Sequence, residues 1–353
     1  MKRVDTVRKA LPDENLDSYL VTDVKNIYYL TGFLDISSAT LNMLIPPEGE
    51  PTLLVTPLSL EAATSQARDC QVKAIAIGET MTSRLLEELK GRSLKRVGYD
   101  TLQIQTYLTL SQSLTGVELL HRAEIVMNQR RVKDDEEASL IRRACELANL
   151  GMEAAVKAVR PGAKEYEIAA QAEYAMRNRG SMGAAFETLV ASGPRSAFPH
   201  GISTDREIRE GEFVTIDLGA IWKGYCSDLT RTVVAGKASR RDLGIMRKVK
   251  EAHDKALKEI RPGAEAVKVD AVARAVLGAC LADYFIHGLG HGVGLDVHET
   301  PTLSRTSKDI LEAGNVVTDE PGVYISGHGG VRTEDTVLVT KEGCEKLTHA
   351  PYP

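Results

Sequence analysis

The segment HGLGHGVGLDVHE, residues 287–299, combines three histidines with four glycines. In an extended segment its alternating glycines leave one face without side chains, so that other backbone or a ligand can approach closely. His291 stands on the opposite side of that pleat, and neutral imidazole is the commonest nitrogen ligand of transition metals in proteins. The segment is therefore predicted to contribute a metal ligand.

Two other interpretations of this segment conflict with its glycines. His287 and His291 have the HxxxH spacing that places two zinc ligands on one face of a helix, but the four glycines make a helix unfavourable here. The glycines also do not fit the GxGxxG pattern of a nucleotide-binding turn. We expect an extended strand.

Two stretches that read as β-hairpins supply carboxylates. EFVTIDLGAIWKGYCSDLTRTVVAG (212–236) and NVVTDEPGVYISGHGGVRTEDTVLVT (315–340) each predict two strands around a central turn. Counted from the two turns, the acids that come opposite each other are Asp217 with Asp228 and Glu320 with Glu334. Residues in such positions have Cβ atoms roughly 4.5–5.5 Å apart, where like charges repel.

These acids are expected to be buried, because Asp217 and Glu320 lie within apolar strand runs, and buried carboxylates are paired, protonated or metal-bound. The five candidate metal ligands are Asp217, Asp228, His291, Glu320 and Glu334. This oxygen-rich set suits two divalent metals that share carboxylates, with manganese or cobalt favoured and zinc or iron possible alternatives. Two metals roughly 3.5–4 Å apart would activate a water molecule and polarise a carbonyl group. The alternative is a pair of solvated hairpins whose acids point outward.

The elements that must position these residues form an internal repeat. KAVRPGAKEYEI (157–168) and KEIRPGAEAVKV (258–269) each place Arg-Pro-Gly-Ala between two helical patterns. A Pro-Gly pair ends one helix and allows the next to begin, so each copy predicts two helices joined by a turn. One acidic hairpin follows each copy. The sequence therefore predicts a duplicated scaffold that converges on one acidic site.

The first part of the chain predicts a separate α/β unit. Strand patterns are LDSYLVT, LNMLIPP, TLLVT, QVKAIAIG and RVGYD, and helical patterns are TSRLLEELKGR and the segment after Thr101. The charged stretch RRVKDDEEASLIRR then opens a long helix that Asp134 and Asp135 can cap. We predict an N-terminal domain over residues 1–122 and a catalytic domain over residues 123–353.

Composition excludes several classes of protein. The chain has 353 residues, 43% of them hydrophobic and 26% charged, which is ordinary for a globular protein of two domains. A net charge of -5 argues against nucleic-acid binding. A charged N-terminus and the absence of a long apolar run predict neither a signal peptide nor a membrane span. We expect a cytoplasmic protein.

The remaining histidines and the cysteines are expected to have no role in the chemistry. His121, His253 and His349 read as surface residues, and His328 as an exposed residue of a turn. The cysteines lack CxxC spacing and read as small buried side chains in a reducing compartment. They are Cys70, Cys145, Cys226, Cys280 and Cys344.

Several motifs together carry a resemblance to a known family. They are PHG (199–201), TIDLGA, GYCSDLTRT, GLGHGVGLDVHE, DEPGVY and GGVRTEDTV, with NIYYLTGF (26–33) and RRVKDDEE (130–137) nearer the N-terminus. With them the chain resembles the pita-bread metallopeptidases, and more closely their prolidase and aminopeptidase P branch with a creatinase-type N-terminal domain. The resemblance implies an α+β protein in which a pita-bread catalytic domain of duplicated helix–hairpin units follows a smaller α/β domain.

The resemblance also implies roles for single residues. Asp217 would bind one metal, Asp228 and Glu334 would bridge both, and His291 and Glu320 would complete the other. Glu320 would also take a proton from the nucleophilic water. Residues implied at the substrate are His200 and His298, as catalytic hydrogen-bond donors, together with His287 and Arg332. Arg332 would either support Glu334 or meet a substrate carboxylate. For these four residues a purely structural role remains the alternative.

The activity that the resemblance implies is hydrolysis of the peptide bond preceding proline in short peptides. An Xaa-Pro dipeptidase (prolidase) is favoured by the compact N-terminal domain, with an aminopeptidase P acting on longer peptides as the alternative. A metal-free creatinase-type enzyme or a non-catalytic binding protein is disfavoured, because all five ligands are present. The family also implies a homodimer, in which the loop Gly32–Ala39 could reach a neighbouring subunit's site.

The chain departs from the family pattern beside two of the ligands. Asp319 precedes Glu320 where an apolar residue is expected, and Thr333 precedes Glu334. Strand alternation turns both side chains away from the metals. We hypothesise a hydrogen bond between Asp319 and Thr333 on the far face of the hairpin.

Overall fold

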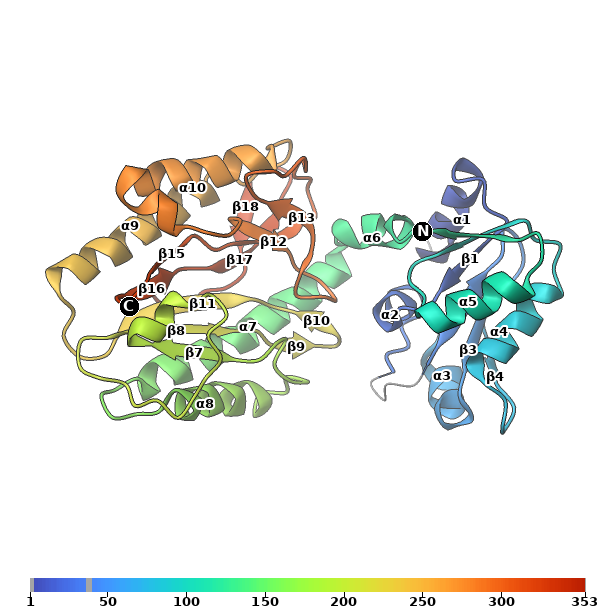
Figure 1. The fold of residues 1–353 in the computed structure, drawn as a ribbon, viewed down its shortest axis with the longest axis horizontal. Coiled ribbons are helices and arrows are strands. Elements are labelled where there is room, and N and C mark those ends of the chain that lie inside the picture. The colour runs from blue at the N-terminus through green and yellow to red at the C-terminus, as the bar shows by residue number, and fades with distance from the viewer. Residues whose placement is uncertain (1–2, 36–39, 353) are drawn as a thin grey trace. The chain divides into compact units, whose positions relative to one another are not determined.

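The structure is a computed structural model that describes residues 3–35 and 40–352. Its contacts divide the chain into two compact units, Met1–Arg130 and Arg131–Pro353 (Figure 1). The sequence-based boundary after residue 122 lies just before helix α6 (Glu124–Arg131) and stays a prediction. The end of the loop Gly32–Ala39, with its suggested reach to a second subunit, lies outside the described residues.

The first unit is built on a six-stranded sheet with the order β4-β3-β2-β1-β5-β6. The apolar runs that predicted strands form β1 to β5, and a leucine-rich core that includes Leu20, Leu44 and Leu85 packs between sheet and helices. The strands are β1 (Ser18–Val21), β2 (Asn42–Ile45), β3 (Thr52–Val55), β4 (Gln71–Ala74), β5 (Arg96–Tyr99) and β6 (Glu118–His121). The helices are α1 (Arg3–Asp13), α2 (Val24–Thr31), η1 (Pro57–Ser59), α3 (Leu60–Gln66), α4 (Met81–Lys90) and α5 (Ile104–Ser113).

The second unit contains the predicted helix pair twice. Helices α7 (Asp135–Ala158) and α8 (Glu165–Arg177) pack together, as do α9 (Arg240–Leu257) and α10 (Ala266–Leu281). The Arg-Pro-Gly-Ala sequence lies in the turn of each pair, where Gly162 and Gly263 have φ of 83° and 79°, a conformation that glycine adopts without strain. Asp134 caps α7 by accepting a hydrogen bond from the backbone N–H of Glu137, as predicted for this helix start.

Both hairpins are present. Strands β8 (Phe213–Leu218) and β11 (Leu229–Val234) pair antiparallel with Asp217 opposite Thr230, so Asp228 lies one diagonal step from Asp217 rather than directly opposite. Strands β14 (Val316–Asp319) and β17 (Asp335–Val339) pair with Asp319 opposite Asp335, which places the neighbouring Glu320 and Glu334 at facing positions. The register of the second hairpin is as predicted.

The remaining strands extend these hairpins into small sheets. Strand orders are β11-β8-β7 and β13-β12-β14-β17-β18, with the two-stranded pairs β9-β10 and β15-β16. Their bounds are β7 (Leu189–Ser192), β9 (Ile221–Trp222), β10 (Tyr225–Cys226), β12 (Gly290–Gly292), β13 (Glu299–Leu303), β15 (Gly322–Ile325), β16 (Gly329–Arg332) and β18 (Cys344–Lys346). Two short 3-10 turns complete the unit, η2 (Gly193–Ala197) and η3 (Ala282–Tyr284).

Within this unit the helix pairs cover opposite sides of the strands, α7 and α8 on one side and α9 and α10 on the other (Figure 1). Each pair buries its apolar face against its own hairpin, in one cluster around Ile168 and Ile216 and a second around Val249 and Val337. Burying two separate apolar faces fixes both hairpins, and the acids at their ends are brought together between them.

In the part of the chain that the structure describes, no helix combines the length and the apolar character that crossing a membrane requires.

The cysteines differ in their exposure to solvent. Cys145 and Cys226 are buried as expected, but Cys70 and Cys344 are partly exposed and Cys280 is exposed, so the expectation that all the cysteines are buried is wrong for these three. Cys280 lies near the end of α10, after a break in the helix at Gly278.

Candidate metal centre

All nine residues predicted for the site line one pocket of about 470 Å³ in the second unit. They come from several separate strands and loops of this unit, and the rest of the lining includes Phe186, Leu189 and Ile202. The nine are His200, Asp217, Asp228, His287, His291, His298, Glu320, Arg332 and Glu334. Polar groups converging in an apolar-walled pocket are typical of a binding or catalytic site.

The glycines around His291 allow its strand to fit between two others. A Cβ on Gly290 would lie 2.0 Å from the carbonyl oxygen of Thr318, and one on Gly292 would lie 2.4 Å from that of Thr300. Only glycine permits backbone to approach this closely on both sides. The prediction of an extended segment is confirmed, and the helical HxxxH interpretation is excluded.

The acids gather around His291. Asp228, His291 and Glu334 each offer a ligand atom, and these atoms all lie within 4.8 Å of one another. The Nε2 atom of His291 is 3.6 Å from a carboxylate oxygen of Asp228 and 3.2 Å from one of Glu320. Asp217 completes the pocket floor. The five predicted ligands are therefore brought together by the fold.

In the absence of a cation, burial and mutual repulsion favour the protonated form of three of the four acids, Asp217, Asp228 and Glu334. Burial raises the pKa of Asp228 and Glu334 well above the ordinary value, and neighbouring carboxylates raise both further. Burial likewise raises the pKa of Asp217, although Arg332 opposes this. For His291, burial is outweighed by the hydrogen bond and charge of Glu320, which raise its pKa to about 9.

The residues present fit divalent metal ions. One oxygen of Asp217, Oδ1, is buried and has no hydrogen-bond partner among the described residues. The donor set consists of four carboxylates, one of which has this unpartnered oxygen, and one imidazole. A pair of hard or borderline cations requires such a set. Metal ions would replace the protons that otherwise relieve the repulsion.

The side chain of Arg332 forms hydrogen bonds with other residues of the protein and is shielded from solvent. Its guanidinium is buried and donates to Asp217 (2.5 Å), to the hydroxyl groups of Thr230 (3.0 Å) and Tyr324 (2.8 Å), and to the carbonyl of Pro199 (3.2 Å). It therefore orients Asp217 directly and reaches Glu334 only through Thr230, whose hydroxyl donates to Glu334 (2.6 Å). A contact with a substrate carboxylate stays a prediction.

The other three histidines of the pocket differ in how far hydrogen bonds and packing restrain their rings. Both ring nitrogens of His287 are engaged, one with the carbonyl of Gly288 (2.7 Å) and one with the hydroxyl of Tyr324 (2.8 Å), which favours a positioning role. His298 packs beside His291 with ring centroids 4.2 Å apart, and burial lowers its pKa, so it is a neutral donor near pH 7. His200 is exposed at the pocket wall.

Sequence reasoning missed two threonines that hold ligands. Besides Thr230, Thr318 accepts a hydrogen bond from the backbone N–H of His291 (3.1 Å), and its hydroxyl donates to Glu320 (3.2 Å). Thr230 lies in the recognised motif GYCSDLTRT and Thr318 directly precedes the motif DEPGVY, and both are two residues from a ligand. Strand alternation places such residues on the ligand face, a signal that the sequence contained.

Replacing Thr318 with valine is expected to weaken metal binding about tenfold, because two ligands lose the partner that orients them. Isothermal titration calorimetry of the metal-free protein with Mn²⁺ measures the affinity. Thr302→Val is the matched control, since Thr302 pairs with His291 across β12 and β13 but is exposed and bonds to Asp309. Equal affinities for wild type and Thr318→Val would contradict the expectation.

Two expectations about the far face of the second hairpin are wrong. Asp319 does not bond to Thr333: its carboxylate has no hydrogen-bond partner among the described residues, and its register partner is Asp335. His253, expected at the surface, is fully buried beside these acids, with Nε2 3.7 Å from Asp319 and 3.2 Å from Asp335. Helix α9 covers this face and places His253 beside Asp319, whereas Asp335 also pairs with Arg231 (2.9 Å) and accepts a hydrogen bond from the hydroxyl of Thr348 (2.7 Å).

His328 is only partly exposed, because its ring bonds to Asp242 at 2.9 Å. The prediction that His328 is exposed to solvent is therefore only partly correct. Its contact joins the hairpin turn to the start of α9.

A pocket in which buried carboxylates surround His291, formed by a duplicated scaffold, defines the site of a metal-dependent hydrolase. Comparison with known families agrees. The chain matches the family described as "Metallopeptidase family M24" over residues 139–341 and the "Creatinase/Prolidase N-terminal domain" over residues 3–132. The protein belongs to metallopeptidase family M24, and its predicted fold class, with a pita-bread catalytic domain and a creatinase-type N-terminal domain, is confirmed.

Similar proteins cover the whole chain. The Xaa-Pro dipeptidase of Pyrococcus furiosus is 35% identical over 98% of this chain and 97% of its own. The prolidase structure from Pyrococcus horikoshii has a TM-score of 0.94 at 34% identity, covering 100% of this chain and 99% of that one. The X-Pro aminopeptidase structure from Thermotoga maritima has a TM-score of 0.87 at 31% identity, covering 96% and 97%.

Proposed function

We propose that the protein is an Xaa-Pro dipeptidase, which hydrolyses the bond before proline in a dipeptide with the help of two divalent metal ions. The observation that carries the proposal is the convergence of five metal-binding side chains in one pocket of a chain similar from end to end to prolidases. A pocket of about 470 Å³ accepts a ligand as small as a short peptide.

The metal ions would be held by the five residues of the cluster. Asp217 would bind one ion, His291 and Glu320 the other, with Asp228 and Glu334 shared between them. When bound, the ions would acidify a water molecule and polarise the scissile carbonyl. The oxygen-rich donor set favours manganese or cobalt over zinc or iron.

The protein's own residues would supply proton transfer and orientation. Glu320 lies in the pocket 3.2 Å from His291, in reach of a water molecule held at the cluster, and would accept its proton. His298 and His200, which both line the pocket, would donate hydrogen bonds to the carbonyl oxygen as negative charge develops there. Arg332 keeps Asp217 oriented throughout.

Substrate length tests the proposal. We expect the Mn²⁺-loaded protein to hydrolyse Xaa-Pro dipeptides with a kcat/KM at least about tenfold above that for Xaa-Pro-Yaa-Zaa, a difference of roughly 1.4 kcal/mol in transition-state stabilisation. Addition of a chelator should remove both activities. A preference for the tetrapeptide would instead support an aminopeptidase P, the second candidate, which the similarity to the Thermotoga structure favours. No hydrolysis of either peptide would refute both.

A homodimer belongs to the same proposal, since the family resemblance implies it. Sedimentation velocity of the metal-loaded protein measures the mass directly, and a species of twice the 38.4 kDa chain mass is expected. A monomer at micromolar concentration would contradict this part of the proposal.

A further inference from the structure

The loop that carries His200 leaves strand β7 at Ser192 and returns to the body of the domain at Thr204. It contains the turn η2 and the PHG motif, and it forms one wall of the pocket. Loops are the most mobile parts of a fold, whereas a hydrogen-bond donor to a reacting group must be held in place. Something outside the loop must therefore fix its position.

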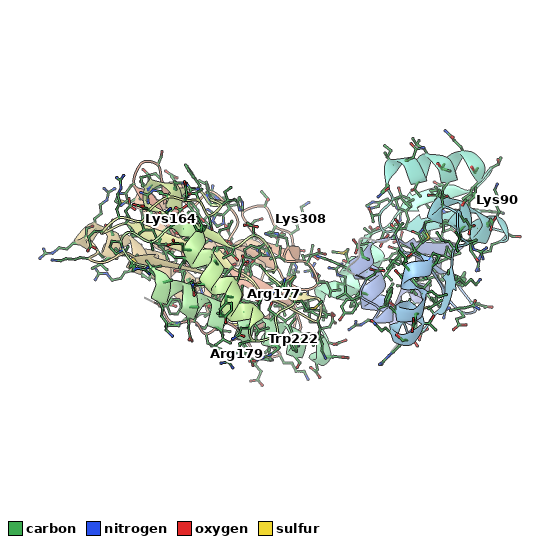
Figure 2. The ribbon with its side chains drawn as sticks, turned by 90° about the horizontal axis from the view of Figure 1, so that it is seen from below. Lys90, Lys164, Arg177, Arg179, Trp222 and Lys308 are labelled. Carbon is green, nitrogen blue, oxygen red and sulfur yellow. The ribbon has the colours of Figure 1, made fainter. Side chains whose placement is uncertain are left out.

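Glu165 contacts both ends of this loop. It is the first residue of α8, the helix that Figure 2 shows between Lys164 and Arg177, and its side chain is fully buried. One carboxylate oxygen accepts from the backbone N–H and the hydroxyl of Ser192, both at 2.8 Å. The other accepts from the hydroxyl (2.6 Å) and backbone N–H (3.1 Å) of Thr204 and pairs with Arg195.

Five donors satisfy the roughly four lone-pair sites of this buried carboxylate, and a position at the start of a helix also favours its negative charge. Four of the five donors belong to Ser192 and Thr204, the residues at which the loop leaves and returns. The bonds that satisfy the buried charge therefore also close the base of the loop.

The middle of the loop is fixed to the metal centre's own scaffold. The hydroxyl of Ser196 accepts from the backbone N–H of Gly330 at 2.8 Å, and the carbonyl of Pro199 accepts from Arg332, which also holds Asp217. Arg195 spans the loop, since it pairs with Glu165 and donates to the carbonyl of Ile202 (2.8 Å). The two ends of the loop are therefore held by Glu165, and its middle is held by Gly330 and Arg332 of β16.

The second half of the duplicated scaffold has a counterpart. Asp270, buried on α10, accepts from the backbone N–H of Leu289 (3.0 Å) and pairs with Arg274 at 2.7 Å. Arg274 donates to the carbonyl of His287 at 2.5 Å. In each half, the second helix thus supplies one buried carboxylate that anchors a segment bearing a pocket histidine.

We propose that Glu165 is a positioning residue of the active site, which fixes the loop 193–203 so that His200 faces the substrate. The statement that His200 meets a substrate rests on the proposed function, whereas the anchoring of the loop does not. The two parts are tested separately.

Hydrogen exchange tests the anchoring without any substrate. In Glu165→Gln we expect amides of residues 193–203 to exchange roughly tenfold faster or more, while those of β8 (Phe213–Leu218) keep their wild-type rates. Asp270→Asn should instead raise exchange around residues 285–289. Unchanged exchange in 193–203 would overturn the proposal, and a uniform rise across both loop and β8 would also do so, because it would indicate general destabilisation.

A double-mutant cycle tests the link to His200. In the Mn²⁺-loaded enzyme, Glu165→Gln should lower kcat/KM for an Xaa-Pro dipeptide about 10- to 100-fold, mostly in kcat, with unchanged metal content. In a His200→Asn background the same change should cost less than about twofold, because its target is already lost. Additive losses would overturn the assignment.

Two further variants complete the design. Glu167→Gln is the matched control: it removes an exposed carboxylate from the first turn of the same helix and should leave activity and exchange unchanged. Thr204→Val removes one bond to Glu165 without disturbing its charge, and it replaces Glu165→Gln in the cycle if that variant does not fold. If the wild type cleaves no Xaa-Pro peptide, the proposed function fails, while hydrogen exchange still decides the anchoring.

Discussion

Replacing Asp228 with asparagine is expected to lower kcat/KM for Xaa-Pro dipeptides by roughly 1000-fold or more, about 4 kcal/mol of transition-state stabilisation. Asp228 is buried within the group of ligand atoms that includes those of His291 and Glu334. An amide carries no charge and cannot be shared between two cations as a carboxylate can. Elemental analysis should therefore show fewer than two metal ions per chain.

The same substitution should stabilise the metal-free protein. Burial and the charge of Asp217 raise the pKa of Asp228 well above its value in the unfolded chain, so ionisation of this group opposes folding increasingly as pH rises above about 4. Asparagine removes that cost. Urea unfolding in chelator at pH 8 should give a higher free energy of unfolding for Asp228→Asn than for wild type, by about 1 kcal/mol or more.

These two readouts together exclude misfolding as the cause of lost activity. Asp205→Asn, on an exposed stretch, is the control and should change neither activity nor stability. Retention of more than about a tenth of wild-type kcat/KM by Asp228→Asn would show that the shared carboxylate is not part of the working site.

Replacing His253 with asparagine is expected to lower the free energy of unfolding by roughly 3 kcal/mol near pH 6. Burial alone would lower the pKa of His253, but the negative charge of Asp319 and the nearby carboxylates of Asp254 and Asp335 raise it to about 9. The histidine is therefore a buried cation of α9 that lies against the acids of both hairpin strands. Asparagine leaves Asp319 without a neighbouring positive charge, and burial already raises the pKa of that carboxyl to about 7.

The pH dependence of this effect has a definite sign. A folded-state pKa of about 9, above the 6.5 of the unfolded chain, means that protonated His253 stabilises the fold fully below pH 6.5. The contribution is lost as pH rises through 9. The difference between wild type and His253→Asn should therefore shrink towards zero by about pH 10.

Urea unfolding at pH 6 and pH 10, in chelator, measures both values. His349→Asn, which changes an exposed histidine, should shift the free energy of unfolding by less than about 0.5 kcal/mol at either pH. A difference for His253→Asn that is independent of pH would mean that the histidine is neutral and stabilises by packing alone.

The duplicated scaffold and the ligands were predictable because their determinants are local. The Arg-Pro-Gly-Ala turns require glycine at positive φ. The apolar residues on either side of Asp217 and Glu320 indicate that the strands around these acids are buried. Register follows from the position of a turn, so the facing positions of Glu320 and Glu334 could be counted along the chain. The resemblance to a known family then assigned each acid a role.

The position of His253 could also have been found. Val249, Ala252 and Ala256 lie on the same face of α9 and are buried, so helical periodicity places His253 among them. The prediction of a surface residue did not apply this period to the segment around His253, and the buried positions of α9 show that the period was the better guide.

The sequence by itself determined which residues could bind metal and which elements carry them, because turns, strands and helix starts depend on near neighbours. Only the tertiary structure decided the partners of Asp319, Arg332 and Glu165, which lie 66, 115 and 27 to 39 residues away along the chain. Such pairs form when separate apolar faces are buried against one another, and no local pattern encodes which polar groups that burial brings together.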